Sequence, residues 1–232
     1  MKTEYHRQIT RAALAPYFTD SAVEVAVRAN DAQDGLKGQV GHAEYHVDNA
    51  IPPAFRYLQE QQRQAVLALQ RGDCEEGMRC LGRALHTVQD FYSHTTYVRT
   101  WLRENNGQAT TPDDIPPLLD WLSRPDLATG RAVFGELLTF LPVVGPVFAR
   151  IVRLPADSHF HQNLDGPHRG PEFAYVLAAA RKHSDYLAHQ VWMQVRETAP
   201  APPACLRPPQ EAQPHPEPAN LNRNARPLHL VE

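Results

Sequence analysis

Apolar residues recur at intervals of three and four positions along most of this chain. Such spacing places them on one face of an α-helix, whereas a half-buried strand would show strict alternation, of which the chain has no convincing run. The pattern predicts an all-α protein with a single multi-helix domain and no sheet. The segments expected to be helical are 6–18, 20–34, 51–72, 74–102, 116–125 and 171–197.

Two further segments depart from this pattern. Residues 104–117 form a polar stretch with several turn residues, and the chain from Thr198 onward is rich in proline with little apolar surface to bury. We therefore expect a helical domain over residues 1–197 and an extended or disordered tail over residues 198–232.

The most apolar stretch is 132–152. It is about long enough to span a membrane, but Glu136, Pro142 and Pro146 interrupt it. A pair of short helices is the expected structure, and a lip that contacts lipid is its functional interpretation.

Composition narrows the function classes. The formal net charge is -3, from 23 basic and 26 acidic residues. This balance gives no electrostatic reason to expect duplex nucleic-acid binding, which is typical of proteins with a basic stripe. The three cysteines, Cys74, Cys80 and Cys205, are too few for a disulfide framework. They indicate a reducing compartment and leave room for one disulfide.

Residues 85–98, LHTVQDFYSHTTYV, carry the most distinctive polar pattern. His86, Asp90 and His94 recur every four residues and share one face of a helix. The helical rise separates the two histidines by about 12 Å, whereas zinc–ligand bonds are only about 2 Å long. If all three are ligands, the stripe implies at least two ions, with Asp90 as the shared ligand. The alternative is a polar stripe facing solvent, but the flanking Phe91 and Tyr97 favour a partly buried cleft.

Three residues cannot saturate two ions, so further ligands must come from other parts of the chain. The candidates are His6, Asp34, His46, Asp48, His161 and Asp165. Other histidines and carboxylates could be the ligands in their place. They could equally be surface residues that bind no metal. The alternatives that stay open are Asp31 for Asp34, and His159 or the pair His168 and Glu172 for His161 and Asp165. Four residues are candidates for orienting a ligand, namely His42, Asp48, His183 and Asp185.

The stretch 85–98 resembles the His-x-x-x-Asp...His helix of the zinc-dependent phospholipase C superfamily, which includes the zinc nucleases specific for single strands. It is most similar to Het-C-like proteins, where a helix of the form LHT-x-x-DF-x-x-H-S/T-x-YV recurs. Three further stretches resemble family motifs in the family's order: YHRQITRAAL, then ANDAQD followed by EYHVDN, then NLDGP. The resemblance covers residues 1–190 approximately.

This resemblance implies an all-helical domain that holds two to three zinc ions. In processed relatives the amine of the first residue is also a ligand, and Met1 stands five residues before His6, as the terminal residue does in the nucleases. The resemblance assigns Asp34, His46, His86 and Asp90 to one ion, Asp90 and His6 to a second, and His94, His161 and Asp165 to a third.

A cleft with several zinc ions suits the hydrolysis of phosphate esters. The leading hypothesis is a phospholipase C-type phosphodiesterase that hydrolyses glycerophospholipids with a zinc-activated water, for which Asp34 is the candidate general base. The first alternative is a single-strand nuclease, disfavoured by the acidic balance and by the lack of a Lys/Arg cluster near the ligands. The second is a non-catalytic, metal-stabilised domain that binds a membrane or a partner.

The first residues show no apolar run that could serve as a signal-peptide core, so we expect a protein that is cytoplasmic as made. A lipase that degrades membranes is dangerous inside its own cell. This favours a toxin or effector that leaves by a signal-independent secretion route. The expected partners are a phospholipid substrate or membrane surface, and an inhibitor, immunity or export protein.

Overall fold

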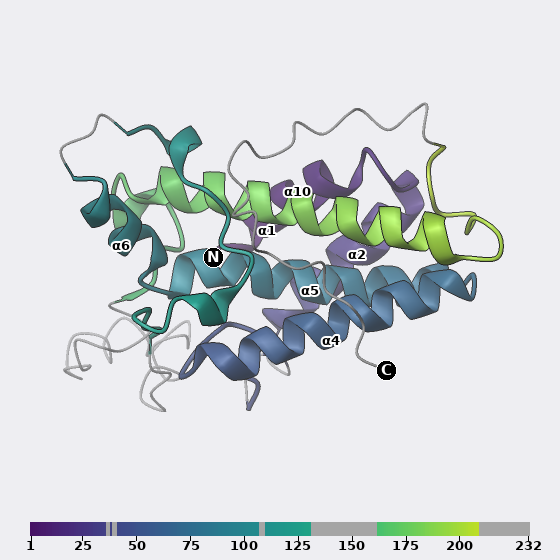
Figure 1. Cartoon of the computed structure of the whole chain (residues 1–232), viewed down its shortest axis with the longest axis horizontal. Coiled ribbons are helices and arrows are strands. Elements are labelled where there is room, and N and C mark those ends of the chain that lie inside the picture. The colour runs from purple at the N-terminus through teal and green to yellow at the C-terminus, as the bar shows by residue number, and fades with distance from the viewer. Residues whose placement is uncertain (36–37, 39–40, 107–109, 131–161, 209–232) are drawn as a thin grey trace, which may run out of the picture.

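The computed structural model describes residues 1–35, 38, 41–106, 110–130 and 162–208 (Figure 1). Within these ranges all regular structure is helical and no strand is formed, which confirms the predicted all-α domain. The α-helices are α1 (Thr3–Leu14), α2 (Asp20–Gln33), α4 (Ile51–Gln70), α5 (Cys74–His94), α6 (Tyr97–Glu104) and α10 (Phe173–Thr198). Short 3-10 helices are η1 (Pro112–Asp114), η2 (Trp121–Ser123) and η4 (Pro167–Arg169).

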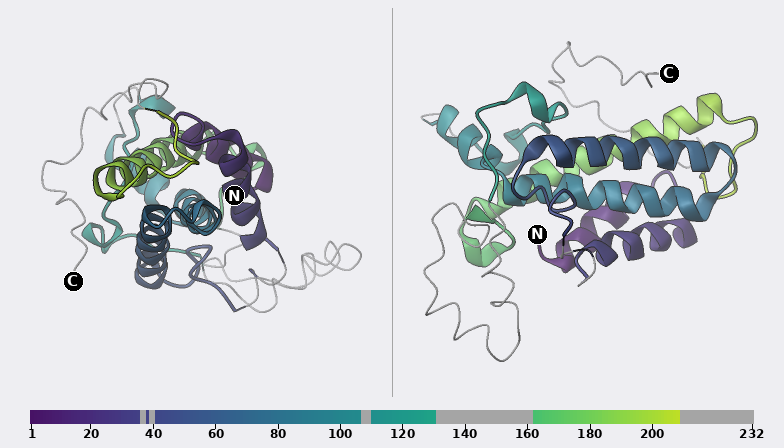
Figure 2. Two further views of the ribbon diagram at one scale, coloured as in Figure 1. Left: turned by 90° about the vertical axis from the view of Figure 1, so that its right-hand side faces the viewer. Right: turned by 90° about the horizontal axis from the view of Figure 1, so that it is seen from below.

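Helix α5 is the central element and contacts α1, α2, α4 and α10 (Figure 2). Its second half is buried without interruption from Ala84 to His94, so polar residues there lie inside the domain. Gly82 permits the close approach of α2, because a Cβ atom at this position would lie 2.1 Å from the carbonyl oxygen of Ala26. The stripe of histidines and aspartate is therefore carried on a helix that is enclosed on several sides.

The predicted helix 74–102 is divided in two by Thr95 and Thr96. Thr95 has extended backbone angles, and its hydroxyl donates to the carbonyl oxygen of Phe91 at 2.6 Å. Threonine is β-branched and competes for backbone hydrogen bonds, which explains the break between α5 and α6. The predicted helix 116–125 also differs, because its regular structure is the single 3-10 turn η2.

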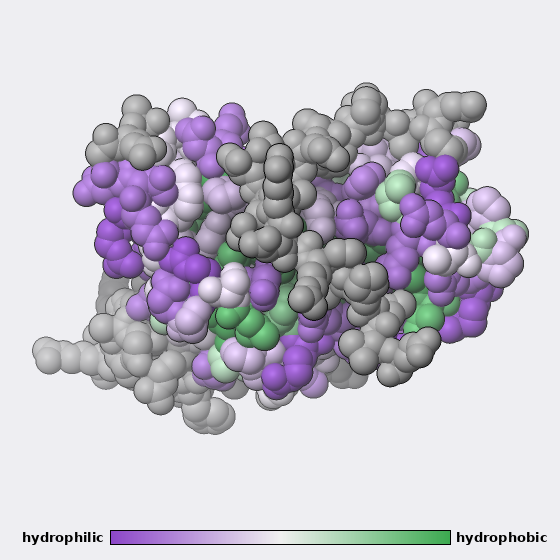
Figure 3. Space-filling model, in the orientation of Figure 1, coloured by the Kyte–Doolittle hydropathy of each residue, from purple (hydrophilic) through white to green (hydrophobic). Residues whose placement is uncertain are grey.

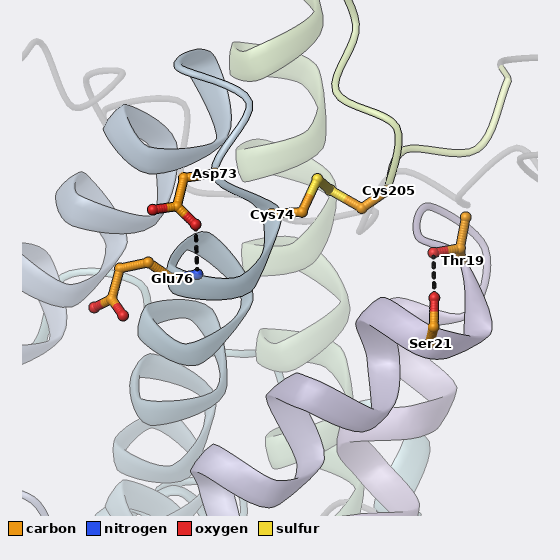
Figure 4. The surroundings of a disulfide bond; sticks show 6 residues. All are labelled: Thr19, Ser21, Asp73, Cys74, Glu76 and Cys205. Carbon is orange, nitrogen blue, oxygen red and sulfur yellow. Dashed lines mark hydrogen bonds between the residues drawn. A yellow bond between two sulfur atoms is a disulfide. The ribbon is translucent and has the colours of Figure 1, made fainter.

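A disulfide joins Cys74, at the start of α5, to Cys205, in the segment that follows α10 (Figure 4). The three cysteines left room for one disulfide, and such bonds form and persist in oxidising environments. The segment also binds the turn between α1 and α2, where the amide of Thr19 donates to the carbonyl oxygen of Cys205 at 2.9 Å. Residues 199–208 of the expected tail are thus attached to the helical domain.

The face shown in Figure 3 is largely hydrophilic, with hydrophobic residues in small patches. Leu122 is a large apolar residue that stays 52% exposed. Among the described residues, no helix combines the length and apolar character needed to cross a membrane. The apolar stretch 132–152, interpreted from sequence as short helices or a lipid-facing lip, lies outside the described residues, as do residues 209–232.

Candidate metal centre

Asp90 lies at the centre of a buried polar cluster on α5. Its side chain is fully buried, and its two oxygens face different groups. Oδ1 lies 3.2 Å from Nε2 of His6, while Oδ2 lies 3.0 Å from Nε2 of His86 and 3.0 Å from Nδ1 of His46. One carboxylate thus meets imidazoles from α1, from α5 itself and from the loop between α2 and α4.

Two sets of side chains bring their ligand atoms within 4.8 Å of one another, close enough to hold a metal ion. Nitrogen and carboxylate oxygen are the donors that zinc commonly takes in proteins. His86 belongs to both sets, so the two sets overlap around one imidazole. The sets are His6, His86 and Asp90, and Asp34, His46 and His86.

The amine of Met1 and two further predicted ligands adjoin this cluster. The Met1 nitrogen lies 2.5 Å from Oδ1 of Asp90, 3.1 Å from Oδ1 of Asp165 and 3.3 Å from Nε2 of His94. His94 and Asp165 also meet, with 3.0 Å between Nε2 and Oδ1. His161, the remaining ligand expected for the third ion, lies outside the described residues, as does its competitor His159.

Oxygen acceptors determine which ring nitrogen carries the proton in three of these histidines. Nδ1 of His6 lies 2.6 Å from Oε1 of Gln89, Nδ1 of His86 lies 3.1 Å from Oδ1 of Asn30, and Nδ1 of His94 lies 2.7 Å from the carbonyl oxygen of His46. A carbonyl-type oxygen only accepts, so each Nδ1 donates and each Nε2 keeps its lone pair.

Nε2 of His94 lies 3.3 Å from the Met1 nitrogen and Nε2 of His86 lies 3.1 Å from Nδ1 of His46, but the nearest polar group to Nε2 of His6 is a carboxylate. Nε2 of His6 is buried and makes no hydrogen bond within the described residues, although Oδ1 of Asp90 is 3.2 Å away. A buried nitrogen lone pair facing an anionic oxygen is unfavourable unless a cation or a proton lies between them. The orphaned nitrogen of His6 fits a metal ligand.

The electrostatics of the cluster favour an ionised Asp90. Burial alone would raise the pKa of this carboxyl, but the Met1 ammonium and the neighbouring histidines, His94 foremost, hold it well below its usual range. Burial likewise disfavours the charged amine, yet Asp165 and Asp90 raise the pKa of the Met1 amine to about 11. Desolvation lowers the pKa of His86 to about 4, which keeps this imidazole neutral and able to bind a metal.

The loop that carries His46 has an unusual backbone. Val47 and Asn49 have positive φ angles of 58° and 66°, and a β-branched residue such as valine rarely adopts this conformation. The loop is held by surrounding contacts, among them a hydrogen bond from the amide of Asn49 to the carbonyl oxygen of Gly130 at 3.0 Å. Strained backbone of this kind is typical of functional sites, and here it places His46 at Asp90.

The exposed side of the cluster is formed by its two outer carboxylates. Asp34, at the C-terminal end of α2, has a side chain that is 21% exposed, and the Asp165 side chain is 23% exposed. Oδ1 of Asp34 lies 3.8 Å from Nε2 of His86. Asp90 between them is inaccessible, so the cluster meets solvent at Asp34 and Asp165.

The competing candidates lie elsewhere. Asp31 pairs with Arg7 at 2.7 Å. His168 is exposed on η4 and Glu172 pairs with Arg99 at 3.1 Å, so neither joins the metal sets.

The residues proposed to orient ligands have mixed positions. His42 contacts Glu44, and His183 bonds Tyr92 in the core, at a distance of 2.8 Å between Nδ1 and the hydroxyl oxygen. Asp48 lies 3.9 Å from Nδ1 of His94 and is the one of these three that adjoins a candidate ligand.

Sequence reasoning did not identify the amides that orient the histidines. Asn30 and Gln89 are fully buried, and each accepts a hydrogen bond from an imidazole of the cluster. Their only signal in the sequence is position: Gln89 precedes Asp90, and Asn30 stands four residues before Asp34 on the same helical face.

Comparison with known proteins places this cluster in a family context. Residues 5–117 match the family model of the VWA7 N-terminal domain. That family has the all-α fold of zinc phospholipase C and P1 nuclease, in agreement with the fold described above. The match includes His6, Asp34, His46, His86 and Asp90, and it ends before Asp165. No curated protein and no solved structure matches the chain significantly.

Proposed function

We propose that this protein is a metal-dependent phosphodiesterase that hydrolyses glycerophospholipids in the manner of a phospholipase C, with two to three zinc ions. The observation that carries the proposal is the buried Asp90 carboxylate, which meets three imidazoles at 3.0–3.2 Å while more exposed carboxylates flank it. A cluster built only for stability would offer each imidazole a donor or acceptor, whereas Nε2 of His6 has none among the described residues.

The donor set divides into positions for separate ions. Asp34, His46 and His86 with Oδ2 of Asp90 would hold one, and His6 with Oδ1 of Asp90 would hold another. A third would take His94 and Asp165, with His161 as the expected further ligand. When bound, zinc polarises phosphoryl oxygens, lowers the pKa of water and neutralises the leaving oxygen.

Asp34 is the residue we propose as general base. Its carboxylate is partly exposed, and Oδ2 accepts a hydrogen bond from the hydroxyl of Thr3 at 3.3 Å, which leaves Oδ1 facing the cluster. A general base must lie within reach of the proton that it removes and must itself be accessible to the substrate. Asp90 is fully buried and cannot meet the second condition.

An apolar hollow supports a lipid substrate. It has a volume of about 550 Å³ and lies beside the loop that carries His46, with Trp121, Leu122 and Leu127 in its wall. Thr129 connects the hollow to the cluster, because it lines the hollow and its hydroxyl also lies 3.3 Å from the carbonyl oxygen of His94. Apolar clefts with a few polar groups are typical of sites for small apolar ligands.

Metal content is the first test. Metal should be measured on purified protein, on Asp90→Asn and on Asp31→Asn, a matched control that removes a nearby carboxylate outside the cluster. We expect the wild type and Asp31→Asn to bind at least two equivalents of zinc, and Asp90→Asn to lose more than one. Equal zinc content in all three proteins would contradict the proposed centre.

Substrate class is the second test. The zinc-loaded protein should release diacylglycerol from phospholipid vesicles, and Asp34→Asn should lose this activity at saturating zinc. The same proteins should be tested for hydrolysis of single-stranded DNA and RNA. Hydrolysis of nucleic acid without release of diacylglycerol would show that the protein is a nuclease and not a lipase. Zinc binding without hydrolysis of either substrate would show a metal-stabilised binding domain.

A further inference from the structure

The buried polar residues behind the metal ligands form a connected unit of their own. Thr10, Asn30, Gln89 and Ser184 come from four helices and are all fully buried. We propose that Thr10, Asn30 and Gln89 are positioning residues that keep His6 and His86 in the tautomer whose Nε2 can bind metal, and that Thr10 sets the direction. This inference rests on the proposed metal centre.

The two amides interlock, so they cannot turn independently. Oε1 of Gln89 accepts from Nδ1 of His6 at 2.6 Å, and Oδ1 of Asn30 accepts from Nδ1 of His86 at 3.1 Å. The amide nitrogen of Asn30 also donates to Oε1 of Gln89 at 3.2 Å. Turning one amide would place two donors or two acceptors against each other unless the other amide turned as well.

Thr10 distinguishes the two joint orientations. Its hydroxyl oxygen accepts from the amide nitrogens of both Asn30 and Gln89, at 3.0 Å and 3.1 Å. A hydroxyl has two lone pairs but only one proton, so it can accept from both amides and can donate to only one. In the turned arrangement both amide oxygens would face Thr10, and one of them would meet a lone pair inside a fully buried site.

Ser184 adds a contact on the same side of Gln89. The amide nitrogen of Gln89 lies 3.3 Å from the hydroxyl oxygen of Ser184. This serine is compatible with either amide orientation, because a hydroxyl that rotates can donate or accept. The preference for the observed amide orientation therefore comes from Thr10.

The direction of the amides decides the chemistry of the histidines. In the observed orientation the amide oxygens accept from Nδ1, which leaves the Nε2 lone pairs of His6 and His86 directed at Asp90. In the turned orientation the amide nitrogens would donate to Nδ1, and the proton of each ring would move to Nε2 and occupy the metal-binding direction. Partners that orient ligating histidines typically change metal affinity by about 10–100-fold when they are removed.

The test compares Thr10→Val with Thr10→Ser and with Thr87→Val. Valine matches threonine in shape without the hydroxyl, and serine retains it. Thr87 is a fully buried threonine on α5 whose hydroxyl donates only to its own helix, at the carbonyl oxygen of Arg83. Two quantities should be measured: the protonated ring nitrogen of His6 and His86 by ¹⁵N NMR of the metal-free protein, and zinc affinity by competition with a chelator.

We expect the wild type, Thr10→Ser and Thr87→Val to carry the proton on Nδ1 of both rings. Thr10→Val should show a mixture of tautomers and bind zinc about 10–100-fold more weakly. The inference is overturned if either ring of the wild type is protonated on Nε2, or if Thr10→Val keeps both the tautomers and the affinity of Thr10→Ser.

The outcomes remain separable from those of the proposed function. The NMR measurement needs no metal, so a wild type that binds no zinc would refute the metal centre while the tautomers still test the positioning unit. If Thr10→Val fails to fold, the ring measurement on the wild type and on Thr10→Ser decides alone.

Discussion

The disulfide between Cys74 and Cys205 should contribute a large part of the stability of this domain. The two residues are 131 positions apart, so the bond closes a loop that includes most of the chain. In the chain-entropy treatment a loop of this length restricts the unfolded state by about 5 kcal/mol at 25 °C, and measured losses on removing a native disulfide are about 2–5 kcal/mol. Domains of this size are stable by only about 5–15 kcal/mol. The reduced protein should therefore be marginally stable.

Urea unfolding of the oxidised wild type and of the double variant Cys74→Ala/Cys205→Ala measures this contribution, with zinc removed from both. We expect a difference of about 2–5 kcal/mol in the free energy of unfolding. Reductant should lower the stability of the wild type and leave the double variant unchanged. Cys80→Ala, which removes the buried thiol outside the disulfide, should keep its sensitivity to reductant. A double variant within about 1 kcal/mol of the oxidised wild type would refute the reasoning.

Three further results are expected. Gly82→Ala should lower the free energy of unfolding in urea by about 1–3 kcal/mol, because the added Cβ would meet the backbone of Ala26. Gly77→Ala should lower it less, since the Cβ there meets a side chain that can move. Equal losses in the two variants would contradict this reasoning. Burial lowers the pKa of His183 to about 3, so the stability that its neutral ring contributes is complete above pH 6.5 and is lost as the pH falls. Between pH 7 and 5 the free energy of unfolding should fall by about 2 kcal/mol more in the wild type than in His183→Asn. Parallel curves of stability against pH for the two proteins would contradict this. Removal of zinc with EDTA should lower the melting temperature of the wild type more than that of Asp90→Asn, which binds fewer ions. An equal shift in both proteins would show that EDTA acts elsewhere.

Several features of the site followed from the sequence because they depend on one helix. The positions of His86, Asp90 and His94 on one face follow from the helical repeat, and their separation made Asp90 the residue to be shared between ions. The structure places imidazoles on both oxygens of Asp90, and its sharing between ions stays a prediction. The residues offered His6, Asp34 and His46 among several candidates, and the resemblance to a family then connected these three to α5.

Other predictions failed where a local rule competed with the surroundings. The helical pattern of 74–102 continued through Thr95, but the backbone there turns extended and pairs with Thr129. The cysteine count left room for one disulfide but could not say which cysteines pair, because folding brings the start of α5 against the segment after α10. Neither contact is visible in the spacing of neighbouring residues.

The sequence by itself determined the helical class and the face of α5 that carries the polar stripe, because both follow from periodicity, and the length of a metal–ligand bond made more than one ion a prediction. Only the tertiary structure decided which carboxylate on α2 reaches the cluster, that Cys74 meets Cys205, and which buried amides lie against His6 and His86. The physical reason is the separation in sequence between the residues that interact. Helix geometry is set by residues three and four apart, whereas ligand orientation depends on hydrogen bonds between residues such as Thr10 and Gln89, which meet only when separate helices pack.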